Sequence, residues 1–288
     1  GCGDDSAAPG DDAGVRDGAV DAARLDANIE DAGAREDAAR MEDAGTDGGP
    51  DAPPPEVADY YIALDGDDEN PGTLAEPFAT VARALEVVGP GDLVYFREGV
   101  YRTPVVLTVD GTEEAPIRWE GHPGELVIFR GPGRGAEPHL EQIRISADWT
   151  VVRHVTVEDS SGPGIRVFAD HAWIDDATVR ECGTTGINFW TNTGGRVSNS
   201  YIFASYNQFG ADGEPADGGG ADGISFAHCE DGLITRTIAF GNSDDGYDLW
   251  GSNNSRIEFS YAVGNGINRW DGAGFAGDGN GFKMGNCD

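Results

Sequence analysis

The sequence predicts an all-β domain, a right-handed parallel β-helix (solenoid) with a short N-terminal capping helix. Glycine is abundant, at 44 of 288 residues, and aromatic residues make up only 9%, a composition typical of turn-rich β architecture. Two further observations indicate a solenoid. A short motif recurs at intervals of 22–23 residues, and an apolar alternation stays in phase through its repeats.

The repeat is clear from about residue 150 onward. A glycine followed by an apolar residue returns after steps of 22, 37, 23 and 35 residues, at Gly164-Ile165, Gly186-Ile187, Gly223-Ile224, Gly246-Tyr247 and Gly281-Phe282. A second apolar series returns after 22, 23, 37 and 23 residues, at Val152, Ile174, Val197, Ile234 and Ile257. The two series share one unit that holds two short β-rich stretches and is interrupted by two long insertions.

Each unit alternates apolar and polar residues after its glycine. The pairs flanking a polar residue are Ile165/Val167 around Arg166, Ile187/Phe189 around Asn188, Ile224/Phe226 around Ser225, Tyr247/Leu249 around Asp248, and Phe282/Met284 around Lys283. Period-two alternation points the apolar pairs inward, where coils stacked about 4.8 Å apart bury one another's apolar rows. An antiparallel sandwich, the competing interpretation, would not keep this pattern in phase over five units.

Upstream of the repeat, residues 60–64 form a predicted strand. A helical stripe follows at Phe78, Val81, Ala82, Leu85 and Val88, and Gly89-Pro90-Gly91 ends it. We expect this helix to cover the N-terminal end of the stack and to protect its strand edges. The first coils are expected at residues 93–97, 105–109, 117–120 and 126–129.

The chain divides into two parts. Residues 1–55 hold 15 acidic residues, four arginines and no aromatic residue, so they cannot bury enough apolar surface to fold and are predicted to be a disordered Asp/Ala/Gly/Pro-rich tether. Residues 56–288 are predicted to form the β-helix catalytic domain. Cys2 resembles the lipid-modified cysteine left when a bacterial lipoprotein signal is cleaved, which we prefer to a chance cysteine at a fragment boundary. A secreted or cell-surface, outer-membrane lipoprotein is therefore expected.

The net charge of −33 argues against a nucleic-acid partner and against docking on anionic lipid. No apolar run approaches the length of a membrane span, so a lipid on Cys2 is the only membrane link that we expect. The domain is expected to be a monomer.

Aligned units place acidic residues on neighbouring coils. Two positions before the first inward residue, Asp222 and Asp245 occupy equivalent places, where carboxylates about 4.8 Å apart repel unless a cation lies between them. Calcium takes oxygen ligands at about 2.3–2.6 Å and fits this spacing, and Asp244 and Asp248 can complete its ligands. The alternative is ordinary Asp-Gly turn chemistry, as at Asp65-Gly66. The convergence of four acids on two coils favours a metal site.

Lys283 is the only lysine among 19 basic residues and lies at the outward position of the coil after Asp248. Unlike arginine, a lysine can be brought toward neutrality by cationic neighbours or by burial, and can then act as a base. An ion pair with Asp248 across the coils is an equally good interpretation.

The insertions, at about residues 207–220 and 266–277, interrupt their units at the same place, just before the strand that follows the glycine. Repeat insertions on one face commonly form the walls of a binding cleft. Arg269 and Trp270 on the second insertion are candidates to contact a carboxylate and to stack on a sugar ring, although a flexible surface loop explains them equally well.

Two long motifs carry a family resemblance. The run Asn242-Ser243-Asp244-Asp245-Gly246-Tyr247-Asp248-Leu249-Trp250, followed by Gly279-Asn280-Gly281-Phe282-Lys283-Met284-Gly285, resembles the family-nine polysaccharide lyases, chiefly pectate lyases, as does Ala221-Asp222-Gly223. The resemblance extends over residues 58–288. It implies β-elimination of an acidic polysaccharide, polygalacturonate or pectin. It further implies Ca²⁺ bound by the four aspartates that match Asp222, Asp244, Asp245 and Asp248, and Lys283 as the Brønsted base.

Family members usually continue through further coils after this lysine, so the domain is expected to be incomplete at its C-terminus. Two other functions stay open. One is a lyase or epimerase for another uronate polymer, such as alginate or a glycosaminoglycan. The other is a non-catalytic glycan-binding lipoprotein, in which Lys283 would have no function.

Cys182, Cys229 and Cys287 are predicted to be free thiols. Cys229 and Cys287 align two coils apart, about 9.6 Å, which is too far for a disulfide.

Overall fold

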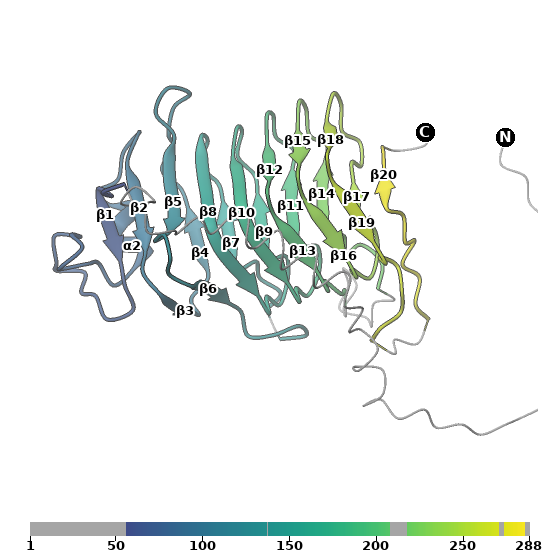
Figure 1. Cartoon of the computed structure of the whole chain (residues 1–288), viewed down its shortest axis with the longest axis horizontal. Helices are drawn as coiled ribbons and strands as arrows, with labels where there is room; N and C mark the ends of the chain where they lie inside the picture. Colours follow the sequence, from purple (N-terminus) through teal and green to yellow (C-terminus); the bar gives the residue numbers. More distant parts are fainter. Residues whose placement is uncertain (1–55, 137, 208–217, 271–273, 286–288) are drawn as a thin grey trace, which may run out of the picture. The chain divides into compact units, whose positions relative to one another are not determined.

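The computed structural model describes residues 56–136, 138–207, 218–270 and 274–285. The predicted tether and Cys2 lie outside these residues. Every recorded pair of strands in the described part is parallel, and the strands stack along one axis (Figure 1). The predicted parallel β-helix is confirmed.

The strands form three rows. The first contains β1 (Tyr60–Ile62), β2 (Leu93–Phe96), β5 (Ile117–Gly121), β8 (Thr150–Glu158), β10 (Trp173–Arg180), β12 (Arg196–Ser198), β15 (Leu233–Thr235) and β18 (Arg256–Glu258). The second contains β3 (Gly99–Tyr101), β6 (Val127–Arg130), β13 (Tyr201–Phe203), β16 (Ile238–Phe240) and β19 (Tyr261–Val263). The third contains β4 (Val105–Leu107), β7 (Ile143–Ile145), β9 (Ile165–Val167), β11 (Ile187–Trp190), β14 (Ile224–Ala227), β17 (Tyr247–Asp248) and β20 (Phe282–Lys283).

A coil therefore has three strands. The prediction of two β-rich stretches in each unit was wrong on this point. The first two rows merge into one 13-stranded sheet because β8 and β10 continue from one row into the other. In the sequence the two short strands therefore look like one stretch.

The register agrees with the predicted alignment. Ile174 pairs with Val152 and Val197 in the first row, and Ile224 pairs with Ile187 and Tyr247 in the third. The remaining members of both series follow in step. A slip of one residue would turn the polar residues of the third row inward, so burial of the apolar rows fixes the register.

The repeated glycines have a steric cause. A Cβ built on Gly186 would lie 2.3 Å from a methyl carbon of Ile202 and 2.8 Å from the carbonyl oxygen of Gly223. A Cβ on Gly223 would lie 2.6 Å from the carbonyl oxygen of Gly246. The coils approach so closely at this corner that only glycine fits.

The predicted capping helix is present but short. α2 (Val81–Leu85) begins after Thr80, whose hydroxyl accepts a hydrogen bond from the Arg83 N–H, and it contacts β1 at the N-terminal end of the stack. Phe78 is not helical. It is buried and forms a β-bridge with Ile62 ahead of the helix.

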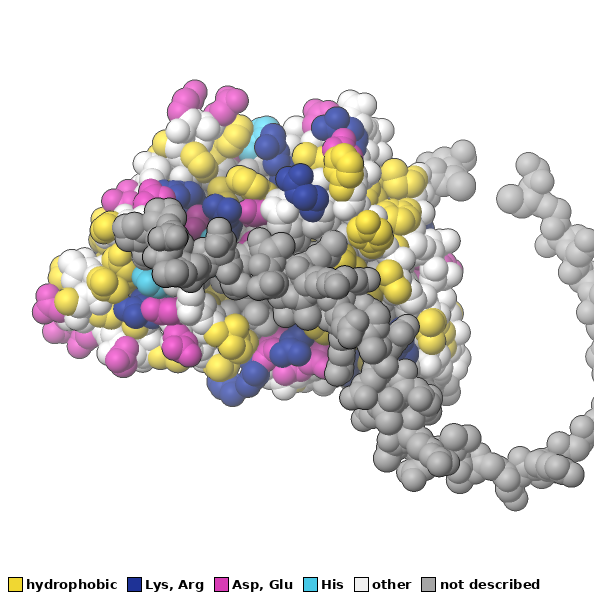
Figure 2. Space-filling model, in the orientation of Figure 1, with side chains coloured by type: hydrophobic (Ala, Val, Ile, Leu, Met, Phe, Trp, Pro, Cys, Tyr) yellow, Lys and Arg dark blue, Asp and Glu magenta, His cyan; other side chains and the backbone are white. Residues whose placement is uncertain are grey.

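At the other end of the stack, hydrophobic side chains are exposed. On the face shown in Figure 2, hydrophobic side chains are visible over the last coils. Phe259 and Tyr261, which lie beside and in β19, are exposed. Among the described residues, no helix is of the length and apolar character needed to cross a membrane.

Cys182 and Cys229 are buried free thiols, as predicted, and burial raises the pKa of Cys182 to about 11. Cys287 lies outside the described residues.

Candidate active site

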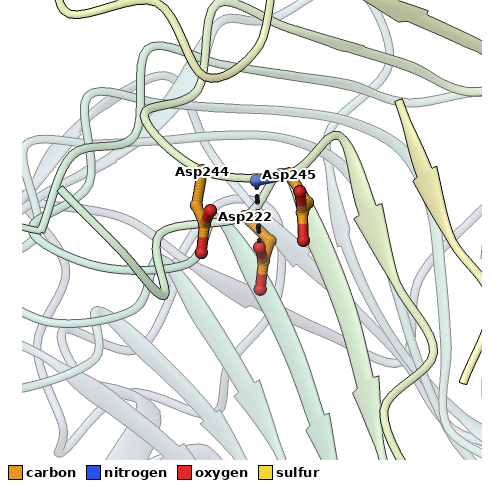
Figure 3. A group of neighbouring side chains, drawn as sticks. All are labelled: Asp222, Asp244 and Asp245. Atoms are coloured by element: carbon orange, nitrogen blue, oxygen red, sulfur yellow. Dashed lines mark hydrogen bonds between the residues drawn. The ribbon is translucent and has the colours of Figure 1, made fainter. Parts of the chain in front are cut away.

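The predicted acidic residues converge just before two neighbouring strands of the third row. Asp222 precedes β14, and Asp244 and Asp245 precede β17. Figure 3 shows the three side chains side by side and pointing the same way. All three are buried, and one carboxylate oxygen from each lies within 4.8 Å of the others. We call these three residues the acidic triad.

The β-helix register brings the triad together. Because Ile224 pairs with Tyr247, the residues two positions earlier, Asp222 and Asp245, occupy equivalent places on adjacent coils, as predicted. The Asp245 N–H donates a hydrogen bond to Asp222 Oδ1 at 3.2 Å. Asp244 enters from the corner that leads into the same strand.

Backbone donors at the C-terminal ends of the two insertions, or just after them, hold the triad in place. The N–H groups of Gly220 and Asp278 donate to the two carboxylate oxygens of Asp244, at 2.5 and 2.6 Å, and the Asn280 N–H donates to Asp245 Oδ1 at 2.8 Å. Hydrogen bonds to a carboxylate are short and strong. The sequence located the insertions beside the site. It gave no signal for these donors, because every residue except proline carries an N–H.

Two carboxyl groups of the triad have raised pKa values. Burial, together with the charges of neighbouring carboxylates, raises the pKa of Asp222 well above its usual value. Burial also raises the pKa of Asp244, against the two backbone hydrogen bonds that lower it. Buried charges of one sign are costly unless a counter-charge is present.

The donor set fits a hard cation such as Ca²⁺, which prefers carboxylate oxygens. Two further oxygens support this fit. Asp245 Oδ2 and Asp248 Oδ1 are buried and accept no hydrogen bond from the described residues. Asp245 Oδ2 has the Lys283 ammonium 3.3 Å away as a counter-charge, whereas Asp248 Oδ1 lacks a partner among the described residues, and a bound cation would satisfy it.

Lys283 lies beside the triad. Its Nζ is 3.3 Å from Asp245 Oδ2, 3.3 Å from Asp248 Oδ2 and 4.0 Å from Asp278 Oδ2. Asp248, predicted as a fourth metal ligand, lies outside the triad and pairs with the lysine across β17 and β20. The nearby carboxylate of Asp278 was not anticipated. The only feature of the sequence that could have indicated Asp278 as a site residue is its position two residues before Asn280.

The charged neighbours of Lys283 are carboxylates, whereas the sequence analysis considered cationic neighbours that would lower its pKa. Burial lowers the pKa of this lysine, but the carboxylates of Asp248 and Asp245 outweigh burial and hold the pKa above its ordinary value. Lys283 is therefore protonated near neutral pH.

Arg269 and Trp270 belong to the connection between β19 and β20. Arg269 is exposed and donates to the Gly264 carbonyl at 3.2 Å. Trp270 stacks on Tyr206, with ring centroids 4.6 Å apart, and Arg134 lies 5.8 Å from the centroid of its ring. One face of Trp270 is thus already in contact with an aromatic ring. Binding of a sugar by Arg269 or Trp270 stays a prediction.

Comparison with known proteins agrees with this architecture. Residues 60–288 match the family described as "Pel9A-like, right handed beta helix region", which also confirms the predicted hand. The chain is 31% identical to the pectate lyase PEL9 of Emericella nidulans, over 81% of this chain and 63% of that protein. It is 29% identical to pectate lyase L of Dickeya dadantii, over 78% of this chain and 55% of that protein.

Solved structures give the same result. The crystal structure of pectate lyase Pel9A superposes with a TM-score of 0.65 at 26% identity, covering 78% of this chain and 58% of that one. A rhamnogalacturonan lyase, at 22% identity and a TM-score of 0.65, shares the fold over 78% of this chain and 61% of its own. The chain thus spans a little over half the length of the relatives that it matches.

Proposed function

Because the chain belongs to the Pel9A-like right-handed β-helix family, we propose that it is a calcium-dependent lyase that cleaves polygalacturonate by β-elimination, with Lys283 as the base. The observation that carries this proposal is the position of Lys283, 3.3 Å from both Asp245 and Asp248 and beside a buried acidic triad. The relatives named pectate lyases support the choice of substrate.

Asp222, Asp244 and Asp245, with Asp248 next to them, would hold the ion. Bound there, Ca²⁺ would neutralise the carboxylate of a galacturonate ring and so raise the acidity of the adjacent C5–H. The triad suits this role because backbone N–H groups donate to all three of its carboxylates, while Asp248 Oδ1 beside it has no hydrogen-bond partner among the described residues.

Lys283 would accept the C5 proton at its Nζ. The electrons of the C5–H bond form a C4=C5 double bond, the C4–O glycosidic bond breaks, and the leaving oxygen takes a proton from water. A lysine can accept a proton only when it is neutral. The carboxylates of Asp245 and Asp248 hold the pKa of Lys283 above its ordinary value, so a cation bound beside them would lower that pKa and increase the neutral fraction of the lysine.

We further propose that the protein works outside the cytoplasm as a monomer, secreted or held at a bacterial surface by a lipid on Cys2. An acidic polysaccharide is too large to reach an enzyme inside the cell, and Cys2 followed by a long acidic segment suits a tethered surface enzyme. Mass spectrometry of the protein from its native membrane would detect a lipid on Cys2, and light scattering would give the oligomeric state.

The central test measures unsaturated product by its ultraviolet absorbance, with polygalacturonate as substrate, before and after a chelator. The proposal expects product with Ca²⁺, loss of product with the chelator, and recovery when Ca²⁺ is restored. Product from alginate or a glycosaminoglycan instead would show that the substrate is wrong but the chemistry right. A folded protein that yields no product from any of these polymers would refute lyase activity.

A further inference from the structure

The outward side chains of the third strand row form one straight ladder. Neighbour by neighbour, the register aligns Arg144, Arg166, Asn188, Ser225, Asp248 and Lys283. Lys283 is at the C-terminal end of this ladder, and the two arginines lie near its other end, where only Val106 precedes them. Arg166 is four coils from Lys283, about 19 Å along the stack at the usual strand spacing.

Arg166 lacks an acidic partner in a very acidic protein. Among the residues that the structure describes it makes no ion pair, and its Nε is buried without a hydrogen-bond partner. By contrast, Arg144 on the preceding coil is paired with Glu141. A buried donor without a partner is costly, and a carboxylate can satisfy a guanidinium through two parallel hydrogen bonds.

Exposed aromatic side chains run beside this ladder on the same face. Phe168 is 40% exposed and lies under Arg166, whose guanidinium carbon is 5.0 Å from the ring centroid. Trp190 and Trp250 are each 38% exposed, with ring centroids 6.2 Å apart, and His228 contacts both rings. Exposed rings of this kind offer large apolar faces, and their clustering on one face indicates a binding surface.

We propose that this face is an extended binding track for the acidic polysaccharide, on which Arg166 binds a uronate carboxylate several sugar rings away from Lys283. Trp190 and Trp250, between Arg166 and Lys283, stack on the intervening rings. The substrate class rests on the proposed function. The track itself rests on the free guanidinium, the exposed aromatic rings and their alignment with Lys283. Arg166 can bind a carboxylate of the polyanion because its guanidinium makes no ion pair with the described residues.

The first test compares substrates of two lengths. Arg166→Ala should raise the KM for polygalacturonate roughly tenfold, the scale of one charged hydrogen bond, and leave kcat nearly unchanged. Cleavage of an oligogalacturonate too short to span four coils should be unaffected. Arg256→Ala, which makes the same charge change on exposed β18 of the first row, serves as control and should alter neither substrate. An equal loss on both substrates would show a structural role for Arg166, and no change with the polymer would refute the track.

The second test separates this inference from catalysis. Binding of polygalacturonate is measured with Lys283→Ala protein and with the Lys283→Ala/Arg166→Ala double variant, at low and at high salt. The double variant should bind roughly tenfold more weakly at low salt, with a smaller difference at high salt. This result would support the track even if the wild-type protein released no product. Equal affinity of the two variants, or no binding by either, would overturn it.

Discussion

Asp248 and Lys283 occupy paired positions on the adjacent parallel strands β17 and β20, and a carboxylate oxygen of the first lies 3.3 Å from the ammonium nitrogen of the second. Their contact therefore depends on strand register and not on a mobile loop. A one-residue slip of β20 would turn Lys283 inward and place Phe282 or Met284 against Asp248. The position of the proposed base is as rigid as the coil that carries it.

Replacement of Lys283 should separate charge from proton transfer. Lys283→Ala is expected to lower kcat by roughly 10²–10⁴, the usual contribution of a general base. Lys283→Arg keeps the positive charge beside Asp248, but arginine does not release its proton at neutral pH, so it should not restore activity. Initial rates of product formation decide this. If Lys283→Arg were nearly as active as wild type, Lys283 would act as a fixed charge and not as a base.

The stability of the calcium-free protein should depend on pH through the buried acids. The pKa values of Asp222, Asp244 and Asp248 are raised in the folded protein, in each case mainly by burial. From about pH 4, the ordinary value for aspartate, up to these raised values, the folded state binds more protons than the unfolded chain. The free energy of unfolding therefore falls as pH rises through this window. We expect a lower Tm at pH 7 than at pH 5 in a chelator.

Calcium should reverse this trend. The ion binds charged carboxylates and only the folded arrangement supplies them together, so saturating Ca²⁺ should raise the Tm more at pH 7 than at pH 5. Differential scanning calorimetry at both pH values measures the effect. A calcium shift that is the same at both values would argue against the acidic triad as the binding site.

Asp222→Asn should remove one of the repelling charges and keep the oxygen that accepts the Asp245 N–H. In a chelator at pH 7 its Tm should rise, by about 2–4 °C for each kcal/mol of repulsion removed in a domain of this size. The increase in Tm caused by Ca²⁺ should shrink or vanish. Asp231→Asn, at an exposed turn with positive φ that asparagine tolerates, is the matched control and should change neither quantity.

The apolar rows should carry most of the stability. Ile187 is fully buried between Ile165 and Ile224 of the neighbouring coils, so Ile187→Ala is expected to lower the free energy of unfolding by about 2–5 kcal/mol. Val106→Ala, at an exposed outward position of the same row, should cost far less. Urea unfolding followed by circular dichroism compares the two. Equal costs would mean that the inward and outward assignment is wrong.

The sequence predicted the fold well because two independent constraints repeat in it. The glycines mark the corner where backbones of successive coils nearly touch, and the alternation after each glycine marks the inner face of the third row. The separate second row was not predicted, because its strands follow those of the first with little or no interruption. β8, for example, is continuous over residues 150–158 although it belongs to both rows, so its sequence shows one apolar pattern and does not reveal where the first row ends.

The site was predicted less completely. Asp222 and Asp245 could be placed together because their position in the repeat is the same, and Lys283 because it follows Asp248 in register. The N–H donors of Gly220, Asp278 and Asn280 depend on how the insertions return to the stack, which side-chain identity does not encode. The raised pKa of Lys283 depends on distances to acids of neighbouring coils, and a list of residue types does not supply those distances.

The constant step between coils also makes the solenoid a ruler. The number of coils between Arg166 and Lys283 sets how far a bound polymer must reach to engage both ends of the track, and each coil adds or removes about 4.8 Å. Deleting or duplicating one coil between β9 and β14 would change that length and leave the triad and the lysine untouched. The shortest substrate that binds with full affinity should then change in the same direction. Minimum substrate length in this architecture is counted in coils.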